Sequence, residues 1–159
     1  MARFFIRKTD QSTWVFVPAI ANTAAPTAAE INAGVLLTPH IAEISGFNFK
    51  NEKIDTPDLA DNFVGSIPGE DVTDDSSLNF YLDDTSTTLW TALAQGTSGF
   101  MVMNWFARTA ASKTRVWPVV SAGRNDVITL DADAAKFMVD FTIPSRPELD
   151  AVWPAGVTL

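Results

Sequence analysis

The chain has 159 residues, of which 47% are hydrophobic, a formal net charge of −8, one histidine and no cysteine. That length and composition predict one globular domain over residues 1–159 with a hydrophobic core of its own. The absence of cysteine excludes disulfides, thiol chemistry and thiolate metal sites. The negative charge argues against a surface that binds nucleic acid. No apolar run reaches the about 20 residues that a membrane span needs.

The first 53 residues predict three strands and a short helix. Alternation of charged and apolar side chains predicts a strand over residues 3–8, and the run Thr-Trp-Val-Phe-Val, closed by Pro18, predicts another over residues 13–17. The run Thr27-Ala-Ala-Glu30 is a capping-box pattern, which predicts a short helix over residues 27–33 with Gly34 at its C-terminal cap. Residues 41–53 predict a strand with a bulge at Gly46, where the apolar alternation is interrupted.

Acidic residues gather in the middle of the chain. Residues 54–107 hold nine Asp and Glu and no Lys or Arg, so this stretch carries −9, whereas the rest sums to about zero (11 basic against 10 acidic residues). Such a run is most often a solvated face; the alternative is a surface that repels, orients or pairs with a charged partner. Within it, residues 56–75 are rich in Pro, Gly and acids. They predict a long, functional or mobile loop with at most a short strand near residues 62–67.

The second half of the chain predicts most of the sheet. Residues 76–82 alternate cleanly and predict a strand, and residues 85–95 predict an amphipathic helix that covers the sheet. Further strands are predicted over residues 99–107, 113–120, 126–130 and 135–143, with turns at residues 122–125 and 131–133. From about residue 144, prolines predict an extended C-terminal tail with Trp153 as an anchor. The fold class is therefore mainly β: an antiparallel β-sandwich or barrel with one flanking helix.

The sequence favours no enzyme. His40 is the only histidine, and no nucleophile elbow, phosphate-binding glycine loop or dinucleotide fingerprint occurs. Adjacent carboxylates in a loop do not supply the two carboxyl groups across a cleft that glycosidases need. We therefore predict no catalytic residues and no cofactor. A calcium-assisted carbohydrate-binding module is an alternative, and its weak candidate ligands are Glu70, Asp71, Asp74 and Asp75.

The strand predicted over residues 99–107 is apolar on both faces. Its side chains divide into Phe100, Val102 and Phe106 on one side and Met101, Met103 and Trp105 on the other. Antiparallel sheets usually keep one face in water, so either the flanking helix covers the second face or another subunit does. The second alternative makes Met101, Met103 and Trp105 candidate interface residues of a protein that assembles head to tail.

Two segments resemble a known family. The runs Pro26-Thr-Ala-Ala-Glu-Ile-Asn-Ala-Gly34 and Ile67-Pro-Gly-Glu-Asp-Val-Thr-Asp-Asp-Ser-Ser-Leu-Asn-Phe-Tyr-Leu-Asp-Asp84 are similar to segments of the major tail tube proteins of long-tailed (siphovirus-type) phages of actinobacteria. The order of elements is also similar across most of the chain: strands, short helix, long loop, strand, helix, strands. The family has no catalytic residues to carry over.

The resemblance implies a β-sandwich or barrel subunit of the virion tail, assembled in the host cytoplasm. Such subunits form hexameric rings whose inner strands join into one continuous barrel, and stacked rings make the tail tube. The tape-measure protein occupies the lumen, and phage DNA later passes through it without sequence-specific binding; tail terminator and baseplate proteins are further partners. Another virion part, such as a tail terminator or head decoration protein, shares this assembly logic.

The resemblance also makes the loop at residues 56–75 the candidate contact between neighbouring or stacked subunits. Its candidate interface residues are Asp58, Asp61, Phe63, Ile67, Glu70, Asp71, Asp74 and Asp75. A negative lumen would keep the phosphates of passing DNA from binding, and the acidic stretch at residues 54–107 is the candidate lining.

Overall fold

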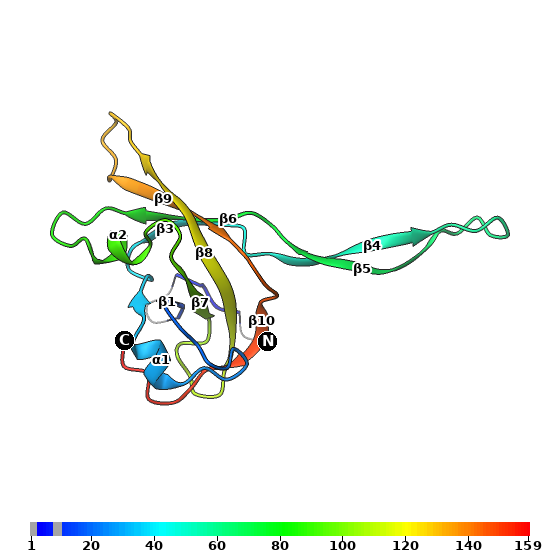
Figure 1. Cartoon of the computed structure of the whole chain (residues 1–159), viewed down its shortest axis with the longest axis horizontal. Helices are drawn as coiled ribbons and strands as arrows, with labels where there is room; N and C mark the ends of the chain where they lie inside the picture. Colours follow the sequence, from blue (N-terminus) through cyan, green and yellow to red (C-terminus); the bar gives the residue numbers. More distant parts are fainter. Residues whose placement is uncertain (1–2, 8–10) are drawn as a thin grey trace.

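The computed structural model describes residues 3–7 and 11–159. In chain order they form β1 (Thr13–Val17), α1 (Ala28–Asn32), β2 (Val35–Leu36), β3 (Ile41–Ser45), β4 (Phe49–Thr56), β5 (Gly65–Thr73), β6 (Ser76–Tyr81), α2 (Thr88–Ala92), β7 (Ser98–Asn104), β8 (Lys113–Val127), β9 (Lys136–Thr142) and β10 (Glu148–Val152). Most strands form a body, and β4 and β5 form a hairpin that projects far from it (Figure 1).

Within the described residues, eight strands form one antiparallel sheet that curls towards a closed barrel. The order along it is β2-β1-β7-β8-β9-β6-β3, and β10 pairs with the first part of β8. Only residues 37–40 join the end strands β2 and β3. This connection bonds to both sides, because the Leu37 N–H donates to the Trp14 carbonyl and the Tyr81 N–H donates to the His40 carbonyl. The two ends of the sheet are thus brought together, which shortens the exposed edges.

The sheet has a core on each face. The inner core takes alternate side chains of β1, β6, β7, β8 and β9, and Leu89 and Leu93 of the α2 segment close it. The outer core lies on the opposite face of β1, β7 and β8, where Ile31 of α1 and Trp153 after β10 are buried. Both faces of β7 are therefore covered by the same chain. This explains its two-sided apolar pattern.

That coverage corrects the prediction that β7 awaits another subunit. Met101 and Met103 are 0% and 1% exposed inside the inner core, so they are not surface contact residues. Trp105, one residue past β7, is half-buried against the same core. The interpretation fails because side chains of the same chain, such as Leu78 of β6 and Leu93 after α2, share the inner core with these methionines, and no sequence pattern links those side chains to this strand.

The elements with a strong local pattern are confirmed. β1 coincides with the strand predicted over residues 13–17, and β6 and β9 match those predicted over residues 76–82 and 135–143. The predicted capping box begins α1: the Thr27 hydroxyl accepts from the Glu30 N–H, and the Glu30 carboxylate accepts from the Thr27 N–H. Gly34 lies one residue past the C-cap, where a Cβ would come within 2.6 Å of a Val15 methyl group.

Other predicted elements differ from the structure. Residues 3–7 form no strand, and Lys8 lies outside the described residues. The strand predicted over residues 41–53 is split into β3 and β4, because the backbone turns at Gly46 and Phe47, both with positive φ. The helix predicted over residues 85–95 is only the short α2. Asp83 accepts from the N–H and hydroxyl of Thr85, and this local turn competes with an earlier helix start.

Three predictions about the loops and the tail are also corrected. The turn predicted at residues 122–125 is a β-bulge inside the single long strand β8, which replaces the two strands predicted there. The tail from residue 144 contains β10, and Trp153, 1% exposed, is the anchor that the sequence predicted. The long loop predicted over residues 56–75 is mostly strand, since β5 begins at Gly65 and only residues 57–64 connect it to β4.

Candidate assembly surfaces

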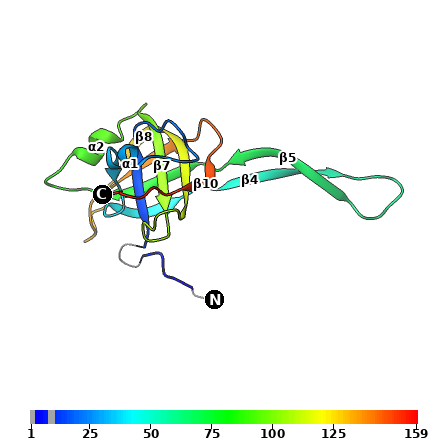
Figure 2. The ribbon, with the colours of Figure 1, turned by 90° about the horizontal axis from the view of Figure 1, so that it is seen from below.

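The β4–β5 hairpin, which we call the arm (residues 49–73), extends away from the body on one side in both views of the molecule (Figures 1 and 2). Its strands pair antiparallel from Phe49 opposite Thr73 to Thr56 opposite Gly65. At about 3.3 Å per residue, an eight-residue strand such as β4 is roughly 26 Å long. All of its residues after Phe49 are exposed, so the arm does not pack along its own body.

The far end of the arm is both apolar and acidic. We call residues 54–67 the arm tip, and its large exposed apolar side chains are Ile54, Leu59, Phe63, Val64 and Ile67. Its charged residues are Asp55, Asp58 and Asp61, with no base among them. A lone two-stranded hairpin is marginally stable in water, and a contiguous exposed apolar surface marks an interaction site. The arm tip is therefore the first candidate assembly surface.

A bulge midway along the arm depends on one glycine. The register shifts between Asn51 and Lys53, and the Asn51 side chain spans the shift. Its amide NH₂ donates to the Gly69 carbonyl at 2.8 Å, and its amide oxygen accepts from the Gly69 N–H at 3.0 Å. A Cβ at residue 69 would lie 2.1 Å from the Glu52 carbonyl oxygen. The two strands can approach here only because residue 69 has no side chain.

The chain enters the arm through two residues in the left-handed region. Gly46 has φ +77°, and a Cβ there would lie 2.2 Å from the Asp75 carbonyl oxygen. Phe47 has φ 56°, and its N–H donates to the Ser76 hydroxyl at 2.9 Å. The Phe47 ring packs edge-on against Trp117, with ring centroids 5.6 Å apart. The base of the arm is therefore anchored in the inner core.

Charged contacts also hold the base of the arm. Lys50 pairs with Asp74 at 2.8 Å, and Arg146, which precedes β10, pairs with Asp71 at 3.3 Å. The Arg146 guanidinium also lies 5.2 Å from the centre of the Phe49 ring. The hydrogen bond from Lys50 lowers the pKa of Asp74, and the same bond raises the pKa of Lys50. Each exposed pair contributes little alone, but together they orient the arm against the body.

The structure divides the acidic residues predicted as site residues into two groups. Asp58 and Asp61 lie in the loop of the arm, where their carboxylates accept from backbone N–H groups two or three residues on. Glu70, Asp71, Asp74 and Asp75 lie along β5 and the turn into β6. Within residues 3–7 and 11–159, no three His, Asp or Glu side chains gather in a group that could hold a metal ion. The four calcium candidates are thus not brought into one site.

Open strand edges form a second kind of candidate surface in the described part of the chain. β3 pairs only with β6, so its outer edge has no partner strand. β8 extends past β7, and beyond Ser121 it pairs with β9 on one side only. The connection at the end of this β8–β9 hairpin exposes Ile128 and Leu130. Such edges and apolar ends are ready to pair with another chain. The sequence did not indicate them, because an edge depends on the order of strands in the sheet.

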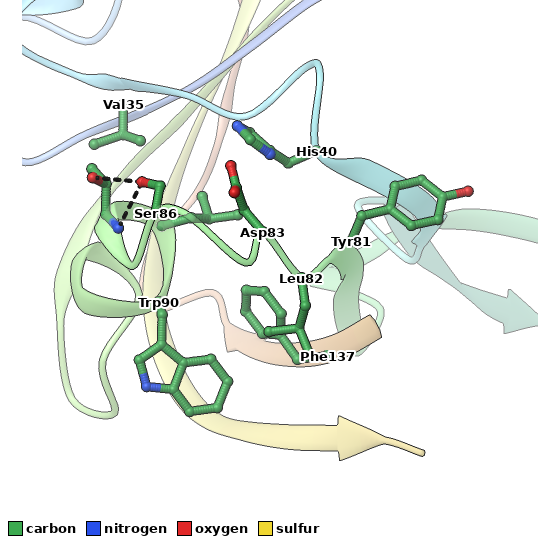
Figure 3. Close-up of a pocket in the computed structure, with 10 residues that line it drawn as sticks. Val35, His40, Tyr81, Leu82, Asp83, Ser86, Trp90 and Phe137 are labelled. Atoms are coloured by element: carbon green, nitrogen blue, oxygen red, sulfur yellow. Dashed lines mark hydrogen bonds between the residues drawn. The ribbon is translucent and has the colours of Figure 1, made fainter. Parts of the chain in front are cut away.

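A pocket near α2 gathers the only histidine with apolar side chains (Figure 3). Trp90, Phe137 and Leu82 line it, and His40 and Asp83 point toward each other at its rim. Hydrogen bonds from Thr85 lower the pKa of Asp83, and the nearby His40 adds a smaller effect in the same direction. The Ser86 hydroxyl bonds to the Thr88 hydroxyl at 3.1 Å and not to His40. The pocket therefore holds no nucleophile–histidine–carboxylate relay.

No helix among residues 3–7 and 11–159 combines the length and hydropathy needed to cross a bilayer. No curated protein matches the chain. Among solved structures it is similar to a chain of the sheath/tube terminator of an extracellular contractile injection system (PVC) in the extended state. That match has 12% identity and a TM-score of 0.65, and it covers 95% of this chain and 100% of that one.

Two further solved structures show the same likeness. A chain of the 6-fold symmetrised anti-feeding prophage baseplate has 10% identity and a TM-score of 0.63, with 100% of both chains covered. A chain of the tube-terminating cap of that prophage has 10% identity and a TM-score of 0.57, with 96% and 92% covered. At such low identity, these TM-scores show a similar fold and no more. The family model of the phage tail tube protein matches residues 2–156. The chain belongs to the phage tail tube protein family.

Proposed function

We propose that this chain is the repeating subunit of the tail tube of a long-tailed actinobacterial phage, and that it associates with itself into hexameric rings that stack into the tube. The observation that supports self-association most directly is the arm tip. It exposes Leu59 completely and 74% of Phe63, and no part of its own body covers them. A tail component made of many identical copies supplies that cover from the next copy.

The placement of the arm supports an open, head-to-tail mode of association. The arm leaves the body on one side (Figure 1). In the proposed mode its tip meets a different surface of the next copy. Such heterologous contacts generate rings where the rotation closes and stacks or filaments where it does not. A tail tube needs both outcomes, one within a ring and one along the axis.

The open strand edges support a shared barrel within each ring. The outer edge of β3 and the free part of β8 beyond Ser121 are available for pairing between neighbours. Pairing of one edge with the other around a ring would cover both of these edges, which removes a route to uncontrolled aggregation. In this arrangement the sheets of six subunits form one continuous wall.

The charge of the chain supports a conduit for DNA ejection. A net charge of −8 gives passing DNA little to bind, because affinity for DNA grows with each phosphate that a basic residue neutralises. The tape-measure protein would occupy the lumen during assembly in the host cytoplasm, and tail terminator and baseplate proteins would contact the two ends of the finished tube in the virion. None of these roles requires a catalytic residue.

Negative-stain electron microscopy of the purified chain tests the proposal. We expect tubes, or stacked rings, of uniform width with six subunits per ring at high protein concentration. A double variant with Leu59→Ser and Phe63→Ser should remain folded but lose the tubes. The matched variant Ile128→Ser/Leu130→Ser removes two exposed apolar side chains from the end of the β8–β9 hairpin. It shows whether the loss of tubes is specific to the arm tip.

Each outcome of that experiment has a meaning. A chain that stays monomeric at the highest concentration tested contradicts self-assembly. Isolated rings that never stack indicate a terminator role, and rings of another symmetry contradict the hexamer. Tubes that survive both arm-tip substitutions contradict the role of the arm in assembly.

A further inference from the structure

A basic and aromatic surface lies where the N-terminal segment meets the turn after β7. We call residues 3–7 and 105–115 the basic patch, because their charged residues are Arg3, Arg7, Arg108, Lys113 and Arg115. The rings of Phe4 and Phe106 are 6.3 Å apart, and both are about half exposed. The Arg115 guanidinium lies 5.4 Å from the centre of the Trp105 ring. The patch thus combines exposed aromatic area with positive charge.

Four of the five bases, Arg3, Arg7, Lys113 and Arg115, are exposed and leave the surface open. Arg108 turns inward and donates to the Thr13 hydroxyl and to the Leu159 carbonyl. Lys113 lies 3.9 Å from Asp150, an exposed and loose pair. Arg115 stacks on Trp105 with no carboxylate partner among the described residues. A partner that brings both apolar side chains and carboxylates fits this surface.

The arm tip has the chemistry that complements the basic patch. Over residues 54–67 it offers five exposed apolar side chains and three aspartates without a base, whereas the basic patch offers aromatic rings and bases without an acid. We infer that the arm tip of one copy docks on the basic patch of a second copy. This inference rests on the self-association proposed above and names the two surfaces that meet.

The geometry of the arm makes the occupant a second copy. The arm is anchored at its base by Phe47 in the inner core and by the Arg146–Asp71 pair, and it points away from the body that carries the patch. A hairpin held in this way does not fold back on its own chain. The contact is therefore between molecules and heterologous, the mode that produces rings and stacks.

Cysteine cross-linking tests the contact cleanly, because the chain has no cysteine of its own. Ala60 in the loop of the arm and Thr109 in the patch are exposed, and neither side chain makes a hydrogen bond in the described structure. We expect assembled Ala60→Cys/Thr109→Cys protein to form a ladder of cross-linked multimers on a denaturing gel under mild oxidation. The matched control, Ala60→Cys/Ala134→Cys, places the second thiol beside the end of the β8–β9 hairpin and should form no ladder.

The outcomes separate this inference from the proposed function. Tubes that give a ladder only with residue 109 support the docking. Tubes that give no ladder, or an equal ladder with residue 134, overturn the docking and leave the tube function standing. A wild-type chain that neither assembles in electron micrographs nor cross-links overturns both.

Charge removal gives an independent measurement. In Asp55→Asn/Asp58→Asn/Asp61→Asn the amide oxygens can still accept the turn hydrogen bonds in the loop, so the fold of the tip is kept while its charge is lost. We expect a several-fold weaker 60–109 ladder at low ionic strength, and the same from Arg3→Gln/Arg7→Gln. The control Asp84→Asn, an exposed acid outside the arm, the basic patch and the open strand edges, should have no effect. An equal loss in the control, or no loss in either test variant, contradicts the electrostatic part of the contact.

Discussion

At the scale of single residues, Gly46 decides whether the arm can leave the body. An alanine there would hold a left-handed backbone at φ +77° and place its Cβ 2.2 Å from the Asp75 carbonyl oxygen. The backbone strain alone costs about 1–2 kcal/mol, and the contact adds to it. We expect Gly46→Ala to lower the free energy of unfolding by more than that, measured by urea titration of tryptophan fluorescence.

Gly96 supplies the matched control for that prediction. It has φ +81°, but a Cβ there would meet nothing within 4 Å, so Gly96→Ala isolates the backbone strain from the contact. The loss of stability should be smaller for Gly96→Ala than for Gly46→Ala. Equal losses in the two variants would show that the approach to Asp75 contributes nothing.

Glu30 should make the stability of the folded chain depend on pH. Its carboxylate accepts from the N–H groups of Ala21 and Thr27 and from the Thr27 hydroxyl, and these bonds, that of Ala21 first, lower its pKa in the folded state. A lowered pKa means that the stabilisation is present above the unfolded value of about 4.3 and is lost as the pH falls through the folded value. We expect Glu30→Gln to be less stable than the wild type at pH 7, with the difference closing towards pH 3. A difference that persists unchanged at low pH would contradict this.

At the scale of elements, the arm should be separable from the body. Gly69→Ala places a Cβ 2.1 Å from the Glu52 carbonyl oxygen and forces the strands of the arm apart. Because the arm does not pack along the body, we expect the unfolding midpoint of the body to change little while tube formation is lost. Gly65→Ala is the control, since its Cβ meets only the Thr56 hydroxyl, at 3.3 Å. An intact tube in Gly69→Ala would show that the bulge is dispensable.

The arm also shows where sequence patterns stop being informative about elements. β6 and β9 were predictable because alternate side chains are buried and leave a period in the sequence, and α1 was predictable from its capping box. Almost every side chain of β4 is exposed, so no alternation separates it from a loop. What was predictable was the chemistry of the segment: its acids, Phe63 and Ile67 do lie on a projecting structure.

The prediction that Met101 and Met103 contact another subunit was wrong for a different physical reason than the prediction of a loop at β4. Their local pattern correctly indicates burial on both faces of β7, but burial does not say what covers a face. Met101 and Met103 share the inner core with side chains such as Leu78 and Phe137, whereas Val102 on the opposite face packs with Ile31 of α1 and with Trp153. Those contacts depend on the topology of the sheet, which no local period records.

At the scale of the whole molecule, two cores on one sheet predict a body that folds without its neighbours. The inner core and the outer core both lie within a single chain, and β7 belongs to each. If the subunit is complete in this way, its unfolding midpoint does not change with protein concentration below the threshold for assembly. Calorimetry over a wide range of dilutions measures this. A midpoint that rises with concentration in samples free of rings would mean that folding depends on another copy.

Substitution of Trp153 tests whether the outer core stabilises the isolated subunit. It is 1% exposed, its N–H donates to the Ser112 carbonyl at 2.9 Å, and it holds the C-terminal segment against β8. Trp153→Ala should cost about 3–5 kcal/mol of unfolding free energy, the usual loss for a buried aromatic side chain. Val152→Ala, at a neighbouring exposed position, is the control and should cost far less. If Trp153→Ala instead left stability intact and abolished only assembly, the outer core would belong to the interface between subunits. One face of β7 would then be covered by another subunit.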